Sequence, residues 1–412
     1  MLNKQIWRAG VAVVSILAVA LLSVTAAAAK ANRASATTIR IWTDRDRRAD
    51  VERIANAWAS SRGVSVQVVE KGFGDIRDSL KTVQSESAPD VVVGAHDWIG
   101  QLAADGQVQP LFPKKVVTKQ FPKYALDAFS YGGRLYGAPV ALENIGLVVN
   151  TRLVKVPKTF AQLEREALAF KRKGSDNLAI AVPQAPAGDA YHMYPFFSGL
   201  GGFVFGKTKT GALSAKKVGV ANPRFLKNAP LIDKWNREGL INSKVDYGTA
   251  KNAFLKQNAA FWLTGPWESD SLKASGLSFR IIQLPKIKYR AVPFLGVQGF
   301  MVTRHANSHG VSSLAKDLVA RYMMGAAAQR ALAAANGRYP ANKAAAKQVR
   351  DSVLAQFGAA GKGGVPMPNI PQMSSVWEEL GGAWLKSTKG AGAVSARTAF
   401  ATAARNIVAK IG

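Results

Sequence analysis

The sequence contains no cysteine among its 412 residues, and this absence removes several kinds of chemistry. Without a thiol the chain can form no disulfide, no thiolate metal site and no cysteine nucleophile. We also expect no lipoprotein-type anchor, because that anchor is attached to a cysteine. Thiol chemistry is therefore excluded.

Acidic residues are scarce. The chain has 26 Asp and Glu against 55 Lys and Arg, which gives a formal net charge of +29. Three explanations of this charge are open: the protein binds a polyanionic partner, it is loosely retained at an anionic cell envelope, or the charge only keeps it soluble. The basic residues are scattered, as in the pairs Lys114–Lys115 and Lys216–Lys217, and no nucleic-acid-binding motif accompanies them. We therefore expect no nucleic-acid partner.

Histidine is also rare, with four residues in the chain. His305 and His309 have the spacing of a helical metal pair, but Gly310 follows and no third ligand type is clustered with them. We interpret them as a surface pair and expect no metal site. There is no nucleophile elbow, P-loop or dinucleotide fingerprint, so the sequence predicts no cofactor and no catalytic residue.

Long hydrophobic runs are absent except near the N-terminus. Lys4 and Arg8 precede an apolar stretch from residue 9 to 24, and small residues follow up to Ala29. This order predicts a secretory signal peptide over residues 1–29, and an uncleaved signal anchor is the alternative. We expect the mature protein to be secreted, in the periplasm or at the outer face of the cell envelope.

The remaining chain alternates strand and helix patterns, which is typical of the α/β class. Its length favours two lobes, because a single core rarely grows beyond about 250 to 300 residues. Thr159 and Gln162 form a capping box that predicts a helix start at Phe160. We expect strands at 38–43, 64–69, 90–94, 145–150, 178–182, 259–263 and 279–284, and helices at 51–58, 75–85, 160–173, 223–238, 250–256, 314–335 and in the last thirty residues.

Polar and aromatic residues follow the first and third predicted strands. Asp44, Asp46 and Arg47 come after the first, and His96, Asp97 and Trp98 come after the third. Open α/β sheets bind ligands in the crevice outside the carboxyl ends of their strands. Carboxylate and guanidinium groups bond sugar hydroxyls, and aromatic faces stack on sugar rings. This mixture favours a carbohydrate site, although each residue alone is equally compatible with a solvated loop or a core position.

Residues 37–412 resemble the bacterial maltose/maltodextrin-binding proteins, which are extracellular solute-binding proteins of ABC sugar importers. Five sequence words carry the resemblance: APDVVVGAHDWIGQLAADG at 88–106, YGAPVALENIGLVVNTRLV at 136–154, TGPW at 264–267, PFLGV at 293–297 and MPNIPQMSSVW at 367–377. The last is the most specific. The resemblance implies a two-lobed periplasmic-binding-protein fold with three interlobe crossovers and a ligand cleft between the lobes.

The lobe boundaries follow from the same resemblance. It implies an N-terminal lobe of residues 37–142 plus 297–346 and a C-terminal lobe of 146–293 plus 352–412. The crossovers near 142–145, 294–297 and 347–351 would form the hinge. The protein would be a monomer that closes around a malto-oligosaccharide. It would then present this ligand to the membrane permease subunits of the importer. Another oligosaccharide such as trehalose is an alternative ligand, and a glycoside hydrolase using Asp97 and Glu143 is a distant alternative.

The resemblance also implies the ligand-binding residues, position by position. Hydrogen-bonding groups and aromatic platforms would come from Asp46, Arg47, Asp97, Trp98, Glu143, Asp189, Tyr191, Trp267, Met367 and Trp377. Four positions depart from the family pattern: Gly94 replaces a tryptophan, Trp98 an arginine, Glu378 an aromatic residue and Gly381 an arginine. We expect Trp98 to rebuild part of the aromatic platform that Gly94 removes.

Overall fold

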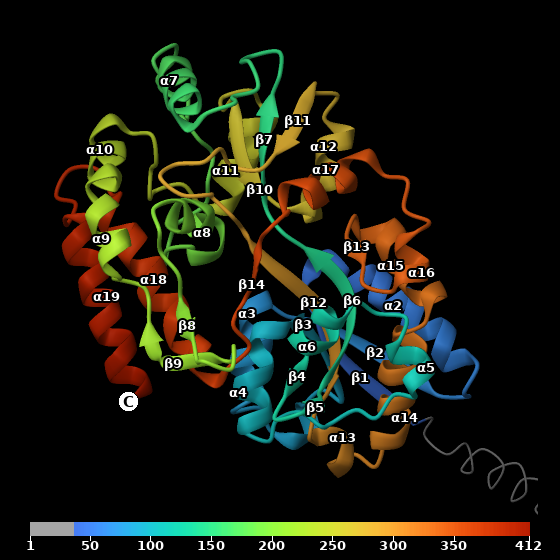
Figure 1. The fold of residues 1–412 in the computed structure, drawn as a ribbon. Coiled ribbons are helices and arrows are strands. Elements are labelled where there is room, and N and C mark those ends of the chain that lie inside the picture. Colours follow the sequence, from blue (N-terminus) through green and yellow to red (C-terminus); the bar gives the residue numbers. More distant parts are fainter. Residues whose placement is uncertain (1–36) are drawn as a thin grey trace, which may run out of the picture.

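The computed structural model describes residues 37–412, so the predicted signal peptide lies outside the described residues. The chain forms two lobes (Figure 1), each built around its own sheet. The first lobe has a seven-stranded sheet in the order β13-β6-β12-β3-β1-β2, with β14 paired to β12. Its strands are β1 (Thr38–Thr43), β2 (Ser65–Glu70), β3 (Val91–Ala95), β6 (Gly137–Glu143), β12 (Phe294–Val302), β13 (Tyr339–Pro340) and β14 (Val365–Pro366).

Helices cover this sheet and connect its strands. They are α2 (Arg45–Ser60), α3 (Phe73–Ser79), α4 (Ile99–Ala104), α5 (Lys115–Thr118), α6 (Lys123–Ala128), α13 (His305–Ser308), α14 (Ser312–Asp317), α15 (Ala326–Asn336) and α16 (Lys343–Ala346). The short elements are the hairpin of β4 (Ser130–Tyr131) and β5 (Arg134–Leu135), the 3-10 turns η1 (Ser85–Ser87) and η2 (His96–Trp98), and the π-helical turn η4 (Leu318–Met323).

The second lobe has a three-stranded antiparallel sheet and many helices. The sheet order is β10 (Phe261–Thr264), β7 (Gly146–Asn150) and β11 (Phe279–Ile282), and β8 (Phe205–Lys207) pairs with β9 (Leu213–Val218) as a separate hairpin. The helices are α7 (Phe160–Lys171), α8 (Ala190–Gly199), α9 (Pro223–Asn228), α10 (Pro230–Glu238), α11 (Tyr247–Leu255), α12 (Ser269–Ala274), α17 (Ser352–Ala360), α18 (Ser374–Ser387) and α19 (Ala396–Ile411), with 3-10 turns η3 (Pro266–Glu268) and η5 (Pro371–Met373).

The first lobe begins with the parallel βαβαβ unit that the sequence predicts. β1 pairs in parallel with both β2 and β3, and α2 connects β1 to β2. Val51, Ile54, Ala55 and Trp58 are all buried on α2, as their helical spacing predicts. The carboxyl ends of β1, β2 and β3 consequently lie along one edge of the sheet, where they face the second lobe.

The chain passes between the two sheets at three places. The first crossing joins β6 to β7 through Asn144 and Ile145, and the second enters β12. The third runs from α16 to α17 through residues 347–351. A further segment, residues 365–373, leaves the second lobe and packs on the first, because Asn369 Nδ2 donates to the carbonyls of Asp127, Ala128 and Ser130 at 3.0 Å each. This segment leads directly into α18.

Some predicted elements differ in the structure. Residues 178–182 make two isolated bridges, at Leu178 and Ala181, instead of a strand. The predicted helix 223–238 is divided into α9 and α10, and α10 begins at Pro230, which has no N–H to donate. The predicted helix 314–335 is interrupted by η4, and α15 restarts after Gly325. Residues 388–395 form a loop within the predicted C-terminal helix.

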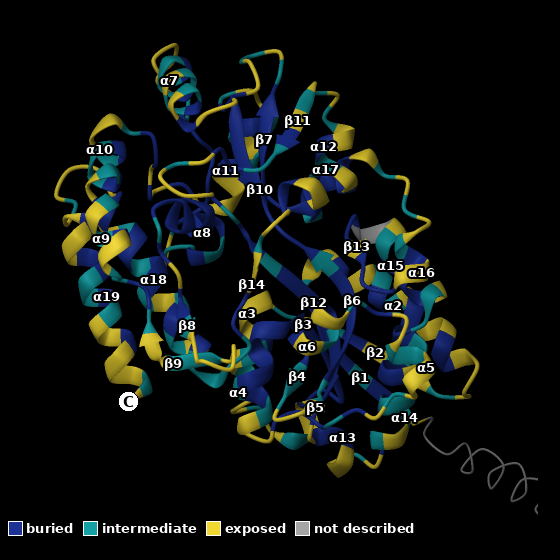
Figure 2. Ribbon diagram, viewed as in Figure 1, coloured by how far each residue is buried: buried dark blue, intermediate teal, exposed yellow. Residues whose placement is uncertain are grey.

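Strands β3, β6, β7, β10 and β12 are almost entirely buried, whereas β2, β11 and β14 are partly or wholly exposed (Figure 2). The predicted capping box is confirmed, since Thr159 Oγ1 accepts from the Gln162 backbone and the Gln162 side chain accepts from the Thr159 backbone.

Within residues 37–412, none of the helices combines the length and the apolar character that a membrane crossing needs.

Candidate ligand-binding site

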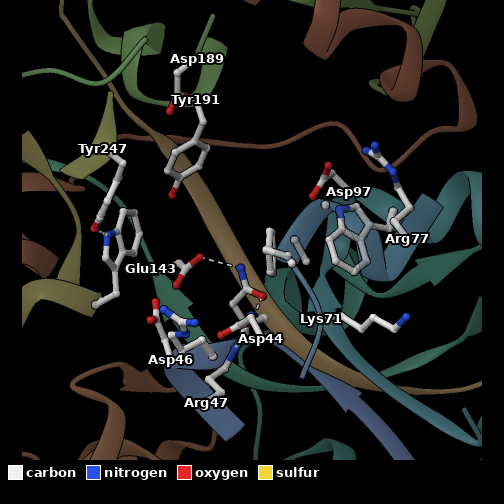
Figure 3. A pocket seen from close by; sticks show the side chains of 18 of the residues that line it. Asp44, Asp46, Arg47, Lys71, Arg77, Asp97, Glu143, Asp189, Tyr191 and Tyr247 are labelled. Carbon is white, nitrogen blue, oxygen red and sulfur yellow. Dashed lines mark hydrogen bonds and ion pairs between the residues drawn. The ribbon is translucent and has the colours of Figure 1, made fainter. Parts of the chain in front are cut away.

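A cavity of about 840 Å³ lies between the lobes, and all ten predicted ligand-binding residues line it. The first lobe contributes mainly charged groups and the second mainly aromatic rings (Figure 3). The predicted residues at its wall are Asp46, Arg47, Asp97, Trp98, Glu143, Asp189, Tyr191, Trp267, Met367 and Trp377. The fold thus brings together residues separated by more than three hundred positions in the chain.

The floor of the cavity is a chain of hydrogen bonds across the first lobe. Arg47 Nη1 donates to Gln298 Oε1 at 2.9 Å, and Gln298 Nε2 donates to Glu143 Oε1 at 2.6 Å. Arg338 Nε donates to Glu143 Oε2 at 3.2 Å, and Arg47 also pairs with Asp44. Burial raises the pKa of Asp44, but the Arg47 guanidinium outweighs it, so the pKa is lowered overall. The network fixes alternating charges at the base of the site.

Asp97 links the two lobes. It lies in η2, directly after β3, and its Oδ2 accepts a hydrogen bond of 3.0 Å from Trp377 Nε1 on α18. Burial raises the pKa of Asp97 to about 6, although the bond from Trp377 and the nearby Arg77 favour the charged form. A hydrogen-bonding carboxylate and an aromatic ring are therefore held against each other in one wall of the cavity.

His96 holds this wall in place as a neutral imidazole. Its Nδ1 accepts from the Val297 backbone at 3.1 Å, so its Nε2 carries the proton toward the Met367 carbonyl, also at 3.1 Å. Burial lowers the pKa of His96 to about 4. The ring thereby connects the second crossing to the segment that carries Met367.

The aromatic platform of the second lobe rests on its own network. Trp267 Nε1 donates to the Tyr247 hydroxyl, which donates to Glu268 Oε1 at 2.6 Å, and Glu268 pairs with Lys251 at 2.8 Å. The Trp267 ring lies on Gly265, where an added Cβ would fall 2.2 Å from Cζ3. These contacts orient the ring that faces the cavity.

Asp189 and Tyr191 have different environments. Asp189 caps α8 by accepting from the His192 backbone at 2.9 Å, and its other oxygen lies 2.7 Å from His192 Nδ1. Burial raises the pKa of Asp189, but His192 and the backbone N–H groups together have a larger, opposite effect. The pKa is therefore lowered overall. The Tyr191 ring stacks on Phe294 at 6.2 Å, whereas its buried hydroxyl has no hydrogen-bond partner. The hydrogen-bonding capacity of that hydroxyl is therefore unused.

Trp98 fills the space that Gly94 leaves, but it is not the exposed platform. A Cβ at Gly94 would lie 2.0 Å from Trp98 Cζ3, and Trp98 is only 4% exposed. Phe73 covers it, with ring centroids 4.9 Å apart, and the Arg47 guanidinium lies 5.3 Å from the Phe73 ring centre. Phe73 is 39% exposed, so it presents the aromatic face at this wall.

The other two departures have simple structural explanations. Gly381 on α18 packs on the backbone of Gly188, and a Cβ there would lie 2.8 Å from the Gly188 carbonyl oxygen, so an arginine does not fit. Glu378 is highly exposed and pairs with Lys410 at 3.1 Å. It does not line the cavity. The Gly188–Gly381 contact sets the distance between α18 and the start of α8.

Several lining residues were not predicted from the sequence. They include Lys71, Phe73, Arg77, His192, Tyr247, Gln298 and Arg338. Lys71 and Phe73 follow the carboxyl end of β2, just as Asp46 follows β1 and Asp97 follows β3. Gln298 and Arg338 carry no comparable signal, because their position depends on the pairing of β12 and β13 with β6.

The interpretation of His305 and His309 as a surface pair is wrong. His305 is buried, and His309 Nδ1 lies 2.7 Å from Asp90 Oδ1 while its Nε2 lies 2.8 Å from the Ser85 carbonyl. These contacts tie α13 and the following turn to the first lobe. Among residues 37–412 there is no group of three or more His, Asp or Glu side chains placed to hold a metal ion.

The chain belongs to the bacterial extracellular solute-binding proteins, whose family model matches residues 53–356. It resembles the solved structure of the Thermus thermophilus maltotriose-binding protein bound to maltotriose, with a TM-score of 0.81 and 28% identity over 91% of this chain and all of that one. This likeness confirms the two-lobed α/β fold.

Curated relatives from Bacillus subtilis strain 168 cover most of the chain. A maltodextrin-binding protein is 27% identical over 346 residues, which are 79% of each chain. A galactooligosaccharide-binding protein is 25% identical over 350 residues, which are 82% of this chain and 81% of that protein. The family's solute-binding role therefore applies here.

Proposed function

We propose that the protein captures a malto-oligosaccharide in the interlobe cavity and delivers it to the permease subunits of an ABC importer. The observation that supports this most strongly is the division of the cavity wall. Asp97, Glu143 and Arg47 offer hydrogen bonds from the first lobe, while Tyr191 and Trp267 offer rings from the second. A sugar ring has polar edges and apolar faces, and it matches both walls at once.

The relatives favour an α-glucan over other sugars. Two of the similar proteins are named for binding maltodextrin and maltotriose, and a third is named for binding galactooligosaccharide. A cavity of about 840 Å³ is large enough for an oligosaccharide. Several stacking contacts and hydrogen bonds would give about micromolar affinity after the costs of association. Trehalose and galactooligosaccharides are the competing ligands.

Ligand capture would proceed by closure of the lobes about the three crossings, with boundaries near residues 142–146, 293–297 and 346–352. A sugar bound to one lobe gains the contacts of the other only in the closed state, so binding shifts the population toward closure. The permease would recognise that closed form. We place the protein outside the cytoplasm, in the periplasm or at the outer face of the envelope, as a monomer.

Hydrolysis of the bound sugar is the alternative that we do not favour. Both oxygens of Glu143 already accept hydrogen bonds, Oε1 from Gln298 and Oε2 from Arg338. A nucleophile or base in that position would first have to leave these partners. We infer a binding protein without catalysis, and chromatography of maltotriose after prolonged incubation should show no glucose or maltose.

The direct test is a calorimetric titration of residues 30–412 with maltose, maltotriose, trehalose, a galactooligosaccharide and a pentose control. Micromolar binding of maltose or maltotriose, without binding of the pentose, is the expected result. Binding of the galactooligosaccharide or trehalose alone would keep the oligosaccharide-binding class and reject the α-glucan assignment. No binding of any sugar would reject the proposed function.

A further inference from the structure

The first lobe carries exposed apolar side chains far from the cavity. Phe112 is 79% exposed and Val116 is 65% exposed, the two highest values among the exposed large apolar side chains of residues 37–412. Tyr124 and Tyr339 are exposed in the same region. None of the four lines the cavity. Ligand capture therefore does not account for them.

Lysines surround these apolar groups without carboxylates between them. Residues 112–124 and 339–347 contain no Asp or Glu. Their six lysines, all exposed, are Lys114, Lys115, Lys119, Lys123, Lys343 and Lys347. Lys123 pairs with Asp127, just outside the range, and Lys343 donates to the Lys119 carbonyl at 3.2 Å. We call the surface of residues 112–124 and 339–347 the basic-aromatic face.

The two segments form one continuous surface. The Lys343 backbone donates to the Gln120 carbonyl at 2.8 Å, and Asn342 Nδ2 donates to Gln120 Oε1 at 2.9 Å. Helices α5 and α16 lie on the side of the first lobe away from α18 and α19 (Figure 1). The face therefore lies away from α18, the helix that carries Trp377.

The face is held in shape from beneath. Leu111 and Phe121, on either side of α5, are both buried in the core of the first lobe, and the Leu111 backbone donates to the Leu135 carbonyl at 2.7 Å. Phe112 directly follows Leu111 and precedes Pro113, so the buried anchor holds the aromatic ring outward. The exposure of Phe112 is thus a property of the folded loop.

We propose that the basic-aromatic face docks on an anionic phospholipid surface, with Phe112 and Val116 entering the headgroup region and the lysines pairing with lipid phosphates. An apolar insertion and a basic cluster together bind a membrane more stably than either signal alone. A dissolved acidic polymer would engage the lysines without needing an exposed ring, so the apolar pair favours a lipid. The proposal goes beyond sugar capture and does not depend on it.

The test is co-sedimentation of residues 30–412, which retain every residue of the three hydrophobic clusters, with two kinds of vesicle. One contains phosphatidylcholine alone, and the other contains equal amounts of phosphatidylcholine and phosphatidylglycerol. We expect binding to the anionic vesicles only, released by molar salt because ionic screening removes the attraction. Absence of binding to the anionic vesicles would overturn the proposal.

Matched variants separate this face from the overall charge. Lys114→Glu with Lys115→Glu should weaken vesicle binding about tenfold or more, and Phe112→Ser should weaken it about threefold or more. The controls are Lys209→Glu with Lys216→Glu, and Phe203→Ser, which alter exposed residues of the second lobe. Equal loss in the charge controls, or no loss in Phe112→Ser, would overturn the proposal. Calorimetric titration with maltotriose shows separately whether each variant keeps its sugar site.

Discussion

Asp97 is buried, and its hydrogen bond to Trp377 joins the two lobes. Its carboxylate accepts from Trp377 Nε1 at 3.0 Å, and burial raises its pKa to about 6. Because folding raises this pKa, the protein loses stability as the pH rises from 3.8, the ordinary value, to about 6, and the loss persists at higher pH. The charged acceptor that lines the cavity therefore lowers the stability of the fold.

Asp97→Asn should therefore stabilise the protein and weaken the sugar complex. At pH 8 we expect the free energy of unfolding to rise by about 1 to 3 kcal/mol, since the amide oxygen still accepts from Trp377 without a buried charge. Below pH 3.8, the ordinary value for Asp, the carboxyl is neutral in both states and the difference should vanish. Denaturant unfolding measured across this pH range checks the sign. A variant that is less stable than wild type at pH 8 would contradict it.

Sugar affinity provides a second readout at Asp97. A hydrogen bond to a charged group contributes more than one to a neutral amide, so maltotriose affinity should fall about tenfold in Asp97→Asn at pH 8. In the wild-type protein the affinity should decline as the pH falls through about 6, and in the variant it should stay flat. A parallel decline in both proteins would assign the pH dependence to another group.

Phe73 presents an exposed aromatic face that the sequence did not identify as part of the site. Phe73→Ala should weaken maltotriose binding by about threefold to tenfold, the value of one stacking contact. It should lower the melting temperature only modestly, because 39% of the side chain is already exposed and only its contacts with Trp98 and Arg47 are lost. Calorimetry and thermal unfolding, with Phe203→Ala as the control, measure both. An unchanged affinity would show that the ring does not contact the sugar.

The sequence predicted which ionic and aromatic residues line the cavity better than it predicted how they pack. Residues after β1 and β3 were found because parallel strand ends share an edge, and the sequence words of the family supplied Trp267 and Trp377. Trp98 was expected to act as a platform, yet it is buried beneath Phe73. The packing of α3 over η2 decides whether Phe73 or Trp98 is exposed. This packing produces no recognisable pattern in the local sequence.

At the scale of elements, α18 positions Trp377 in the wall of the cavity. It approaches α8 through the backbone contact of Gly188 and Gly381. Local patterns predicted most elements of the first lobe, since alternating strands and striped helices have distinct periods. They did not predict the interruption at η4, nor the reduction of residues 178–182 to two bridges, because both depend on neighbouring segments.

Gly381→Arg tests the contact between α18 and the Gly188 loop. The new side chain begins 2.8 Å from the Gly188 carbonyl oxygen, so we expect a loss of about 1 to 3 kcal/mol in stability and weaker maltotriose binding through displacement of Trp377. Gly382→Arg is the matched control, since a Cβ there meets no atom within 4 Å and helix propensity improves equally. Thermal unfolding of the two variants should differ clearly. Equal melting temperatures would contradict the role of the close contact.

At the scale of the whole molecule, two lobes enclose one cavity and are joined by three crossings. The opposing walls differ in chemistry, with the charged network of Arg47, Gln298, Glu143 and Arg338 on one side and the rings of Tyr191 and Trp267 on the other. Neither wall alone matches both the polar edges and the apolar faces of a sugar. Closure of one lobe on the other would therefore complete the binding site.

The most direct test of a sugar site between the lobes is a calorimetric titration of wild type and Trp377→Ala with maltotriose. Trp377 contacts both lobes, since it lies on α18 and bonds Asp97. We predict about micromolar binding to wild type and a loss of at least tenfold in the variant. Tyr289→Ala, an exposed aromatic residue outside the cavity, should bind as wild type does. Unchanged maltotriose affinity in Trp377→Ala would contradict the placement of the sugar between the lobes.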